Sequence, residues 1–456
     1  MSNNLYVDIE EKIWRIIDGW RASGITISDA VRSTLYLLVL KKVLKESTSD
    51  VVQEDFQAIL TLQRCMYAFQ EGVDENSLLV ESGRLIEKRY HLQTGFFGNF
   101  FANVCNLKSW KATLNTSLKR IIEIPDVEDE VMSAVAERII LKGFQMEGYR
   151  VAEAVSSTTI AELLRVVLSV QDGDRFYDGT IGCGISALRC VRDADASIRG
   201  MDLNVSALQI ATLYTILSGK KKFEFKAGDF TLEQSNEKYH KIAMDIPFGV
   251  KTGDYIGEQI VICNKWLGGA QGRDLDILMV GKVLEVLEEE GRAAIVVPNS
   301  FLFRISKANK IIRESILEKK MLKAVISLPA LHFETGARSS ILLLEKNEDK
   351  ILFVDMDSDE MAFFQKQRRE VPILTEEGKQ KLLYILETRE EVEGVSSLVS
   401  VQQLRENEFN FSPIRYVSIT ESISFRDIQT INNDLKLLYE ELKEIEEENS
   451  KMRLFN

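Results

Sequence analysis

Seven short runs of β-forming residues, separated by segments of helical composition, constrain the fold of this chain more than any other feature. They are Arg175–Asp178, Ile198–Asp202, Phe223–Ala227, Lys241–Asp245, Ala293–Val297, Leu322–Ser327 and Ile341–Glu345. Strands that alternate with helices form βα units, because a parallel neighbour is reached only through a crossover connection. The pattern predicts an α/β fold with a seven-stranded, mainly parallel sheet.

The segments on either side lack this alternation and are predicted to be helical. In Ser28–Leu44 apolar residues recur in steps of three and four behind a candidate cap at Ser28 and Asp29. Near the C-terminus, the same steps between residues 428 and 445 predict a short coiled-coil-like helix over 425–450. The apolar face of this predicted helix is equally suited to pack against a helix of a partner protein or against the rest of this chain. The expected division is a helical N-terminal domain (1–145), an α/β domain (146–355) and a mostly helical C-terminal extension (356–456).

Composition bounds the class of protein. The 456 residues are 45% hydrophobic and 28% charged, which is typical of a globular protein of two or three domains. No apolar stretch reaches the roughly 18–20 residues of a membrane span, and the first residues lack a signal-peptide pattern, so we expect a cytoplasmic protein. The five cysteines and three histidines are scattered, which predicts neither a metal site nor a disulfide framework.

The net charge of −13 is unlike that of a protein that grips a DNA backbone alone. Basic residues cluster at Lys220–Lys222 and in Arg304–Lys310. Each cluster fits a solvated surface as well as a phosphate contact. If the protein acts on DNA, we expect most of the contact to come through a partner.

A glycine-rich loop, Asp178–Gly184, follows the first predicted strand. Glycines let the backbone approach a ligand and adopt positive φ, and the helix that follows offers free N–H groups. The spacing Gly182-x-Gly184-x-x-Ala187 also passes as a dinucleotide fingerprint, so a dehydrogenase is an alternative at this point. The loop predicts a nucleotide-like cofactor without deciding which one.

The next three strands decide between these classes. Asp202 ends the second strand, Asp229 follows the third, and the fourth runs into Asp245–Phe248. Each of these acids alone fits a loop with a capping aspartate, but open α/β sheets bind ligands along the shared carboxyl edge of their strands. A dehydrogenase does not require the Asp-x-Pro-Phe element. The joint order therefore favours a cofactor site beside a second site.

Together these motifs resemble those of the adenine-N6 DNA methyltransferases, most closely the modification (methylase) subunits of type I restriction-modification systems. The matching elements are Ser157–Thr159, Asp178–Gly184, Gly200–Asn204, Gly228–Asp229, Asp245–Phe248, Gly291–Pro298, Ala324–Pro329 with Phe333 and Thr335–Gly336, and Arg415–Val417. The resemblance spans most of the chain and is tightest between residues 150 and 350. It implies that residues 146–355 form a Rossmann-like, seven-stranded methyltransferase domain.

The resemblance implies S-adenosyl-L-methionine as the cofactor. In the family pattern Asp202 holds the ribose and Asp229 the adenine amino group. The loop Asp178–Gly184 wraps the methionine end, helped by Thr158 and Thr159. The expected cofactor-binding residues are Thr158, Thr159, Asp178, Gly179, Thr180, Gly182, Gly184, Asp202, Leu203, Asp229 and Phe230.

Asp245–Phe248 resembles the family's Asn/Asp-Pro-Pro-Phe/Tyr/Trp motif, which implies Asp245, Ile246, Pro247 and Phe248 as the catalytic residues. Methylating an exocyclic amine needs acceptors that align the nitrogen lone pair, and a base in duplex DNA must be flipped out to reach them. Asp245 and the carbonyl of Ile246 are the expected acceptors, and Phe248 is the expected stacking ring. Isoleucine replaces a proline that fixes φ in the family motif.

The resemblance implies transfer of a methyl group to the N6 amine of adenine in DNA, by a modification subunit that a separate specificity subunit guides. The expected partners are DNA, that specificity subunit, and a restriction subunit or a second copy of the chain. The replaced proline keeps an alternative open, a catalytically weak or inactive methylase-like scaffold in a restriction or defence complex. Methylation of a protein or RNA amine is a third reading.

Overall fold

The computed structural model describes residues 3–49, 75–98, 100–105, 109–147, 156–234, 236–331, 337–358, 361–365 and 371–417. The predicted elements at Phe333 and Thr335–Gly336, and the predicted helix 425–450 with its apolar seam, lie outside these residues. Within the described ranges no helix combines the length and the apolar character that a membrane span requires.

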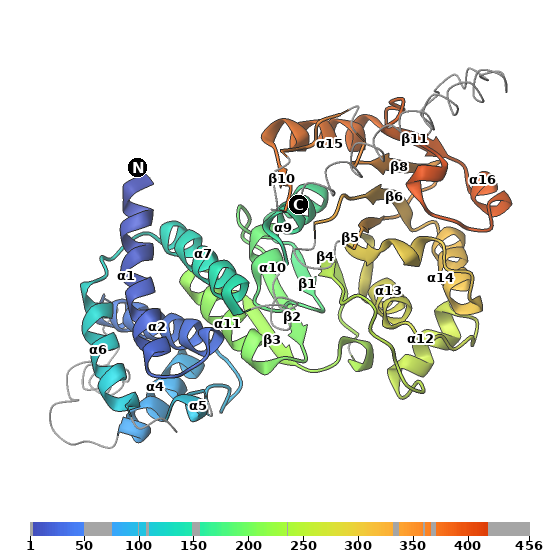
Figure 1. The fold of residues 1–456 in the computed structure, drawn as a ribbon. Helices are drawn as coiled ribbons and strands as arrows, with labels where there is room; N and C mark the ends of the chain where they lie inside the picture. The colour runs from blue at the N-terminus through green and yellow to red at the C-terminus, as the bar shows by residue number, and fades with distance from the viewer. Residues whose placement is uncertain are drawn as a thin grey trace, which may run out of the picture. The chain divides into compact units, whose positions relative to one another are not determined.

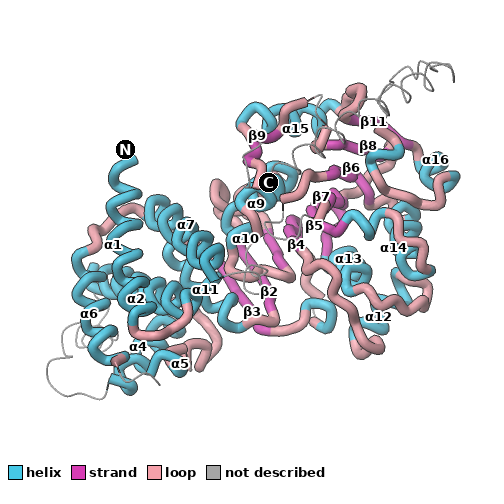
Figure 2. Tube along the Cα trace, viewed as in Figure 1, coloured by secondary structure: helices cyan, strands magenta, loops and turns pink. Residues whose placement is uncertain are grey.

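The described residues of the N-terminal part are mostly helical (Figures 1 and 2). Its helices are α1 (Asn3–Ala22), α2 (Ile27–Ser49), α4 (Glu75–Arg89), α5 (Ala102–Cys105), α6 (Trp110–Glu123) and α7 (Asp129–Glu147). Helix α2 lies at their centre, with every residue from Ala30 to Leu40 buried, and α1, α6 and α7 pack around it. The predicted helix Ser28–Leu44 is confirmed as part of α2.

The central sheet has nine strands rather than the predicted seven. They are β1 (Arg175–Asp178), β2 (Ser197–Asp202), β3 (Phe223–Ala227), β4 (Tyr239–Asp245), β5 (Leu287–Pro298), β6 (Leu322–Ser327), β7 (Ser339–Leu344), β8 (Ile351–Asp355) and β11 (Ser396–Val399). Their order is β11-β8-β6-β7-β5-β4-β1-β2-β3. Only β7 and β11 run antiparallel to their neighbours.

The seven predicted runs all form strands, and β8 and β11 are the two that the prediction lacked. A short run such as β8, which is apolar up to its final Asp355, has no periodicity that separates a buried strand from a buried helix. Strand β11 has only four residues, two of them serines, and is defined by its antiparallel pairing with β8. Both strands thus depend on tertiary pairing rather than on local pattern.

Helices cover both faces of the sheet (Figure 1). One face carries α9 (Thr158–Leu168), α10 (Ile185–Cys190), α11 (Val205–Leu217) and α15 (Glu376–Thr388), and the other carries α12 (Glu258–Trp266), α13 (Leu275–Val286), α14 (Lys307–Glu318) and α16 (Val401–Glu406). In β4, Ala243 packs into the first layer while Ile242 and Met244 pack into the second. This is the alternation that a strand between two helical layers requires.

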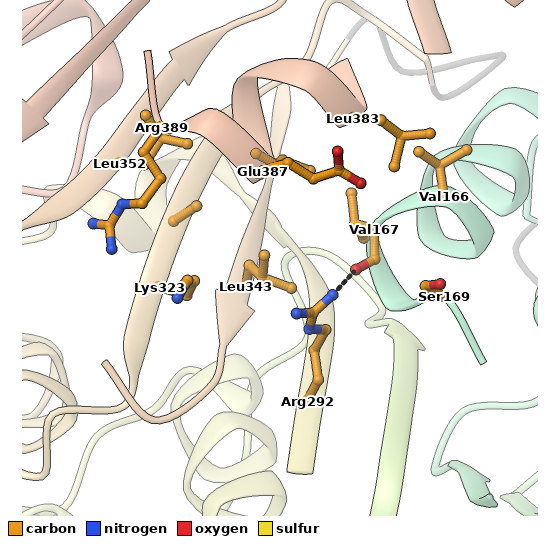
Figure 3. Close-up of a pocket in the computed structure, with 12 residues that line it drawn as sticks. Val166, Val167, Ser169, Arg292, Lys323, Leu343, Leu352, Leu383, Glu387 and Arg389 are labelled. Atoms are coloured by element: carbon orange, nitrogen blue, oxygen red, sulfur yellow. Dashed lines mark hydrogen bonds between the residues drawn. The ribbon is translucent and has the colours of Figure 1, made fainter. Parts of the chain in front are cut away.

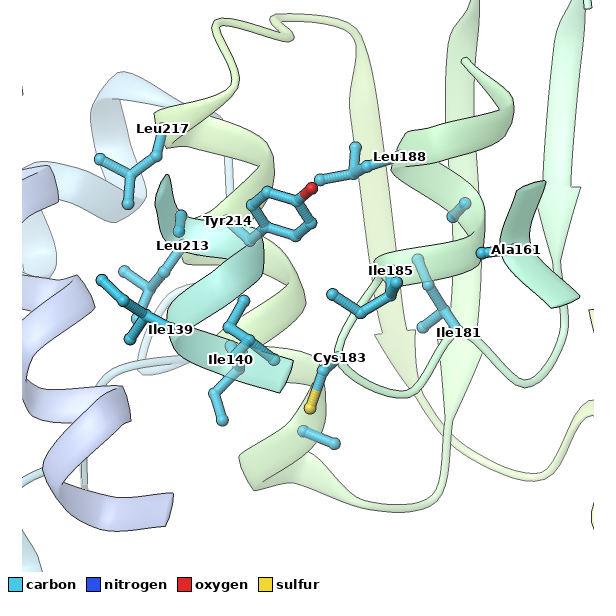
Figure 4. Packing of buried hydrophobic residues seen from close by; sticks show 14 of the residues in the cluster. Ile139, Ile140, Ala161, Ile181, Cys183, Ile185, Leu188, Leu213, Tyr214 and Leu217 are labelled. Atoms are coloured by element: carbon cyan, nitrogen blue, oxygen red, sulfur yellow. The ribbon is translucent and has the colours of Figure 1, made fainter. Parts of the chain in front are cut away.

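Helix α11 joins the N-terminal helices to the sheet. Every residue from Ala207 to Leu217 is buried, because α11 lies between the sheet and the pair α2 and α7. A helix that is apolar on all sides needs such a position. Figure 4 shows Ile139 and Ile140 of α7 beside Leu213 and Tyr214 of α11.

The described residues after β8 are only partly helical, in contrast to the predicted mostly helical extension. They form a two-stranded antiparallel sheet of β9 (Phe364–Gln365) and β10 (Ile373–Leu374), followed by α15, β11 and α16. Strand β10 contacts α9 on the first face of the central sheet. The segment therefore returns to the α/β body instead of leaving it.

Candidate functional site

The four predicted acids lie at the ends of four neighbouring strands. Asp178 ends β1, Asp202 ends β2 and Asp245 ends β4, while Asp229 comes two residues after β3. These strands are adjacent and parallel in the order β4-β1-β2-β3, so their carboxyl ends share one edge of the sheet. This edge is where ligands bind in open α/β folds.

The glycine-rich loop after β1 is held against the end of β2. The N–H of Gly182 donates to a carboxylate oxygen of Asp202 at 2.8 Å, and the N–H of Ile181 donates to the Met201 carbonyl at 3.0 Å. Gly184 has φ of 85°, and a Cβ there would lie 3.2 Å from the Cβ of Ala211 in α11. The positive φ and the close helix explain why glycine is required at this position.

Asp178 is a buried carboxylate among other acids. Its side chain accepts hydrogen bonds from the N–H of Thr180 at 2.9 Å and from the Thr180 hydroxyl at 3.3 Å. Burial, together with the negative charges of Asp202 and Asp245, raises the pKa of Asp178 to about 7. In the described part of the chain no cation forms an ion pair with it. The site is thus electrostatically suited to a cationic ligand.

Gly179 and Phe230 pack against each other at the base of this loop. A Cβ on Gly179 would lie 2.7 Å from the ring of Phe230, which is a clash. Phe230 begins the short 3₁₀ helix η2 (Phe230–Leu232), is 2% exposed, and lies with its ring centre 5.5 Å from that of Tyr177. In this position Phe230 supports the loop from the core, and its expected contact with the cofactor stays a prediction.

Polar and apolar residues are sequence neighbours in the segments that follow β2 and β3. The second oxygen of Asp202 accepts from the N–H of Asn204 at 2.7 Å, and Asn204 caps α11. Leu203 between them is 73% exposed. Asp229 accepts from the N–H and the hydroxyl of Thr231 at 2.8 and 2.7 Å. An exposed leucine beside an anchored carboxylate suits a ligand with an apolar ring and hydroxyl groups.

Thr158 and Thr159 form the first turn of α9, which Ser157 caps by accepting from the N–H of Ile160 at 3.2 Å. Thr159 is 3% exposed, and its hydroxyl donates to the carbonyl of Pro372 at 2.8 Å. The partner lies 213 residues away in sequence, just before β10. No local signal in the sequence marks this contact.

The target segment continues directly from β4. The Asp245 carbonyl accepts from the Thr180 hydroxyl at 3.4 Å, which joins this segment to the glycine-rich loop. Ile246 is 2% exposed, and its N–H donates to the Val296 carbonyl of β5 at 3.4 Å. Phe248 is half-buried and packs against both apolar layers of the molecule. The predicted catalytic and cofactor segments are therefore adjacent.

A cavity of about 280 Å³ lies at the opposite edge of the sheet, away from these residues. Arg292 lines it from the middle of β5, Lys323 and Leu352 line it from the starts of β6 and β8, and the ends of α9 and α15 close it (Figure 3). Arg292 donates there to the Val167 carbonyl at 3.3 Å. The amino ends of parallel strands are not where this fold class places its chemistry, so the cavity is not part of the candidate site.

Residues 128–424 match the N-6 DNA Methylase family. The chain is 26% identical over 333 residues to the Type I restriction enzyme MjaVII methylase subunit of Methanocaldococcus jannaschii, which covers 67% of this chain and 55% of that protein. It is 24% identical over 396 residues to the Type I restriction enzyme MpnII methylase subunit of Mycoplasma pneumoniae, covering 77% and 70%. The chain thus spans about half of the length of the first of these relatives.

Two solved structures share the fold. A methyltransferase subunit of a type I restriction-modification system from Streptococcus thermophilus superposes with a TM-score of 0.69 at 20% identity, covering 91% of this chain and 100% of that chain. A chain from a structure of a type I R-M system superposes with a TM-score of 0.66 at 17% identity, covering 98% of each. The family match confirms the predicted resemblance and, with it, S-adenosyl-L-methionine as the cofactor. Because the match extends over more than half of its length, this protein belongs to the N-6 DNA Methylase family.

Proposed function

We propose that this chain transfers a methyl group from S-adenosyl-L-methionine to the N6 amine of adenine in DNA, as a modification subunit that a separate specificity subunit guides. The observation that carries the proposal is the convergence of Asp178, Asp202 and Asp245. The three carboxylates end three adjacent strands, and they lie close enough for the last two to raise the pKa of the first. A cofactor pocket and a target pocket then share one edge of the sheet.

The residues present fit this cofactor. When bound, S-adenosyl-L-methionine supplies an electrophilic methyl group on a sulfonium, and it carries a second positive charge on its ammonium. Asp178 is a buried carboxyl group with a pKa of about 7, and no cation among the described residues pairs with it, so its charge on ionisation is available to a cationic ligand. Asp202 offers acceptors to the ribose, Asp229 an acceptor to the adenine amino group, and Leu203 an apolar face to the ring. Gly182 and the other loop residues bring the backbone close to the methionine end.

The target segment supplies the second half of the proposal. The carboxylate of Asp245 accepts a hydrogen bond from the adenine amine, which turns the nitrogen lone pair toward the cofactor. The carbonyl of Ile246 is the second acceptor, and Phe248 stacks on the base. An adenine in a duplex has to leave the stack to reach these groups.

The contacts of Ile246 favour the hypothesis of an active enzyme over that of an inactive scaffold. A proline at this position restrains φ but has no N–H. Ile246 keeps its N–H, which extends the ladder between β4 and β5 by a 3.4 Å bond to the Val296 carbonyl, and its side chain is buried. The hydrogen bond and the packing together restrain the backbone that aims the Ile246 carbonyl. Isoleucine thus replaces one restraint by two others.

The net charge of the chain indicates that a partner subunit supplies the contact with DNA. The net charge of −13 is unlike that of a protein that holds a DNA backbone alone. A specificity subunit that reads the DNA sequence supplies that contact, and a restriction subunit or a second copy of the chain completes the assembly. The helical domain 1–145 and the catalytic domain from residue 146 remain parts of the proposal, with a sheet that extends to β11.

The test begins with calorimetric binding of S-adenosyl-L-methionine to the full chain and to the Asp202→Ala, Asp229→Ala double variant. We expect binding to the unaltered chain and none to the variant. Transfer of a labelled methyl group is then measured into DNA, RNA and protein, with and without candidate specificity subunits. Label in DNA that disappears in Asp245→Ala supports the enzyme. Binding without any transfer supports the scaffold, and no binding at millimolar cofactor rejects both readings.

A further inference from the structure

Exposed apolar side chains lie on two loops at the carboxyl edge of the sheet. Val250 is 43% exposed in the target loop (residues 245–252), which continues from β4. Phe303 is 49% and Ile305 is 91% exposed in the ridge loop (residues 303–306), which links the 3₁₀ helix η3 (Asn299–Leu302) after β5 to α14. Strands β4 and β5 are neighbours, so both loops leave the same edge.

A polar network ties the two loops together through Asp274. Lys251 of the target loop pairs with one oxygen of Asp274. The other oxygen lies 3.3 Å from a guanidinium nitrogen of Arg304 in the ridge loop and accepts from the Asn309 amide at 3.2 Å. Arg304 also donates to both oxygens of the buried Asp276, at 2.8 and 3.0 Å. The ridge loop is therefore anchored directly beside the segment that carries Asp245 and Phe248.

A buried arginine fixes the backbone of the ridge loop. Arg313 of α14 is 2% exposed and donates to the carbonyls of Phe301 at 2.7 Å, Arg304 at 2.8 Å and Phe409 at 2.7 Å. With the carbonyl of Phe301 before the loop, the carbonyl of Arg304 within it and the Arg304 side chain all held, the loop keeps its apolar side chains outside the core. A rigid projection enters a partner at a smaller entropic cost than a flexible one.

Positive charge flanks this apolar projection. Lys307 follows the ridge loop directly, is exposed, and forms no ion pair among the residues that the structure describes. Lys251 on the other side has a side chain that is 64% exposed while it pairs with Asp274. An apolar side chain flanked by cations is complementary to duplex DNA, because the stacked bases of DNA are apolar and its phosphates are negatively charged.

We propose that the ridge loop, with Ile305 at its tip, enters duplex DNA beside the target base and occupies the space that an extruded adenine leaves. The inference rests on the proposed function, because a base that reaches Asp245 and Phe248 leaves a gap in the stack. Apolar side chains inserted between base steps hold such unstacked DNA open. Ile305 is then a positioning residue for the DNA, with no contact to the reacting atoms.

The experiment compares two DNA substrates with the full chain, candidate specificity subunits and methyl-labelled S-adenosyl-L-methionine. One is a pool of random-sequence duplexes, and the other is the same pool with an unpaired bubble that holds a central adenine. Ile305→Ser is expected to lower transfer into paired DNA about tenfold or more, and into bubble DNA less than about twofold, because the bubble has already lost its stacking. Phe303→Ser is expected to act in the same direction.

Ile414→Ser is the matched control. Ile414 is 77% exposed in the 3₁₀ helix η4 (Pro413–Arg415), outside both loops, so the same substitution there is expected to leave transfer into both substrates unchanged. Three outcomes overturn the inference. Ile305→Ser loses transfer equally on the two substrates, it loses transfer on neither, or Ile414→Ser shows the same selective loss as Ile305→Ser. Loss of binding to a protein subunit with an unchanged substrate ratio also overturns it and assigns the ridge loop to a protein interface.

The unaltered chain separates this inference from the proposed function. If it labels bubble DNA but Ile305→Ser shows no selective loss, the function stands and the ridge inference fails. If it binds cofactor but labels neither substrate with any candidate specificity subunit present, the proposed function fails and the ridge inference fails with it. Calorimetry of cofactor binding to both isoleucine variants checks that they fold, and we expect affinities equal to that of the unaltered chain.

Discussion

The carboxylate of Asp202 accepts a 2.8 Å hydrogen bond from the N–H of Gly182. The end of β2 thereby holds the glycine-rich loop that follows β1, and the same carboxylate accepts from Asn204 at the cap of α11. One side chain thus positions both the loop and the helix that border the candidate cofactor site. This dual role separates Asp202 from Asp229, whose carboxylate bonds only to its own turn among the described residues.

Asp202→Ala is expected to weaken cofactor binding at least about tenfold and to destabilise the fold by about 2 kcal/mol, because charge-assisted hydrogen bonds to the backbone are lost. Asp202→Asn keeps an acceptor for Gly182 and is expected to lose affinity with little loss of stability. Calorimetry and chemical denaturation measure the two effects separately. Unchanged affinity in both variants would remove Asp202 from the cofactor site.

Asp178 makes stability and cofactor binding respond to pH in opposite directions. Its pKa is raised from 3.8 to about 7 in the folded state, so between these pH values the folded chain holds a proton that the unfolded chain has lost. The free energy of unfolding therefore falls as pH rises toward about 7 and stays lowered above it. Affinity for the cationic cofactor is expected to rise over the same window, as the carboxylate ionises.

Asp178→Asn tests this linkage, because the amide keeps the acceptor for Thr180 but has no charge. At pH 8 the unliganded variant is expected to be more stable than the unaltered chain, while its cofactor affinity is lower. At pH 4 the two chains are expected to be nearly equal in stability. Denaturation and calorimetry at both pH values give the result, and a variant that is less stable at pH 8 contradicts the electrostatic account.

Asp245→Ala is expected to lower methyl transfer by about 100-fold to 1000-fold, which is the usual effect of removing a group that orients a reacting centre. Cofactor affinity is expected to change less than about threefold, since the loss falls on the target side. Asp245→Asn keeps an oxygen acceptor and is expected to retain most of the rate. Transfer that survives in Asp245→Ala would place the target elsewhere.

Ile246→Pro restores the family motif at the position where this chain departs from it. Proline removes the N–H that donates to Val296 and part of a buried side chain, so we expect a loss of stability of about 1–2 kcal/mol. The rate of transfer is expected to stay within about threefold, because a proline ring restrains the same φ. A large gain in rate would mean that isoleucine leaves the carbonyl misplaced.

Arg189 of α10 connects the N-terminal helices to α9. It pairs with Glu137 of α7, lies 3.6 Å from Glu162 of α9, and donates to the Thr158 carbonyl at 3.2 Å. Arg189→Ala leaves buried carboxylates without this partner and is expected to cost about 3 kcal/mol of stability. Arg192→Ala, which removes a half-exposed partner of the same Glu137, is expected to cost less than about 1 kcal/mol. Urea denaturation of both variants measures the difference.

Much of the α/β body and the position of the candidate site followed from local pattern. The seven predicted runs all form strands, and the acids near the ends of β1, β2, β3 and β4 share an edge, because parallel strands joined by crossovers end on the same side. That argument needs only the order of the elements along the chain. The motif resemblance likewise depends on residues that are near one another in sequence.

Tertiary structure alone decided the rest. Strands β8 and β11 are part of the sheet because they pair with neighbouring strands. The Thr159 hydroxyl donates to the carbonyl of Pro372, which lies 213 residues away in sequence, and no local signal predicts this bond. Packing likewise placed Phe230 beneath Gly179, and the Asp274 network brought the ridge loop to the target loop. The sequence by itself determined seven of the nine strands and the acids near the ends of the first four, because backbone preference and periodicity act over a few residues. Which distant groups then meet was decided by burial and long-range pairing, which act only once the chain has folded.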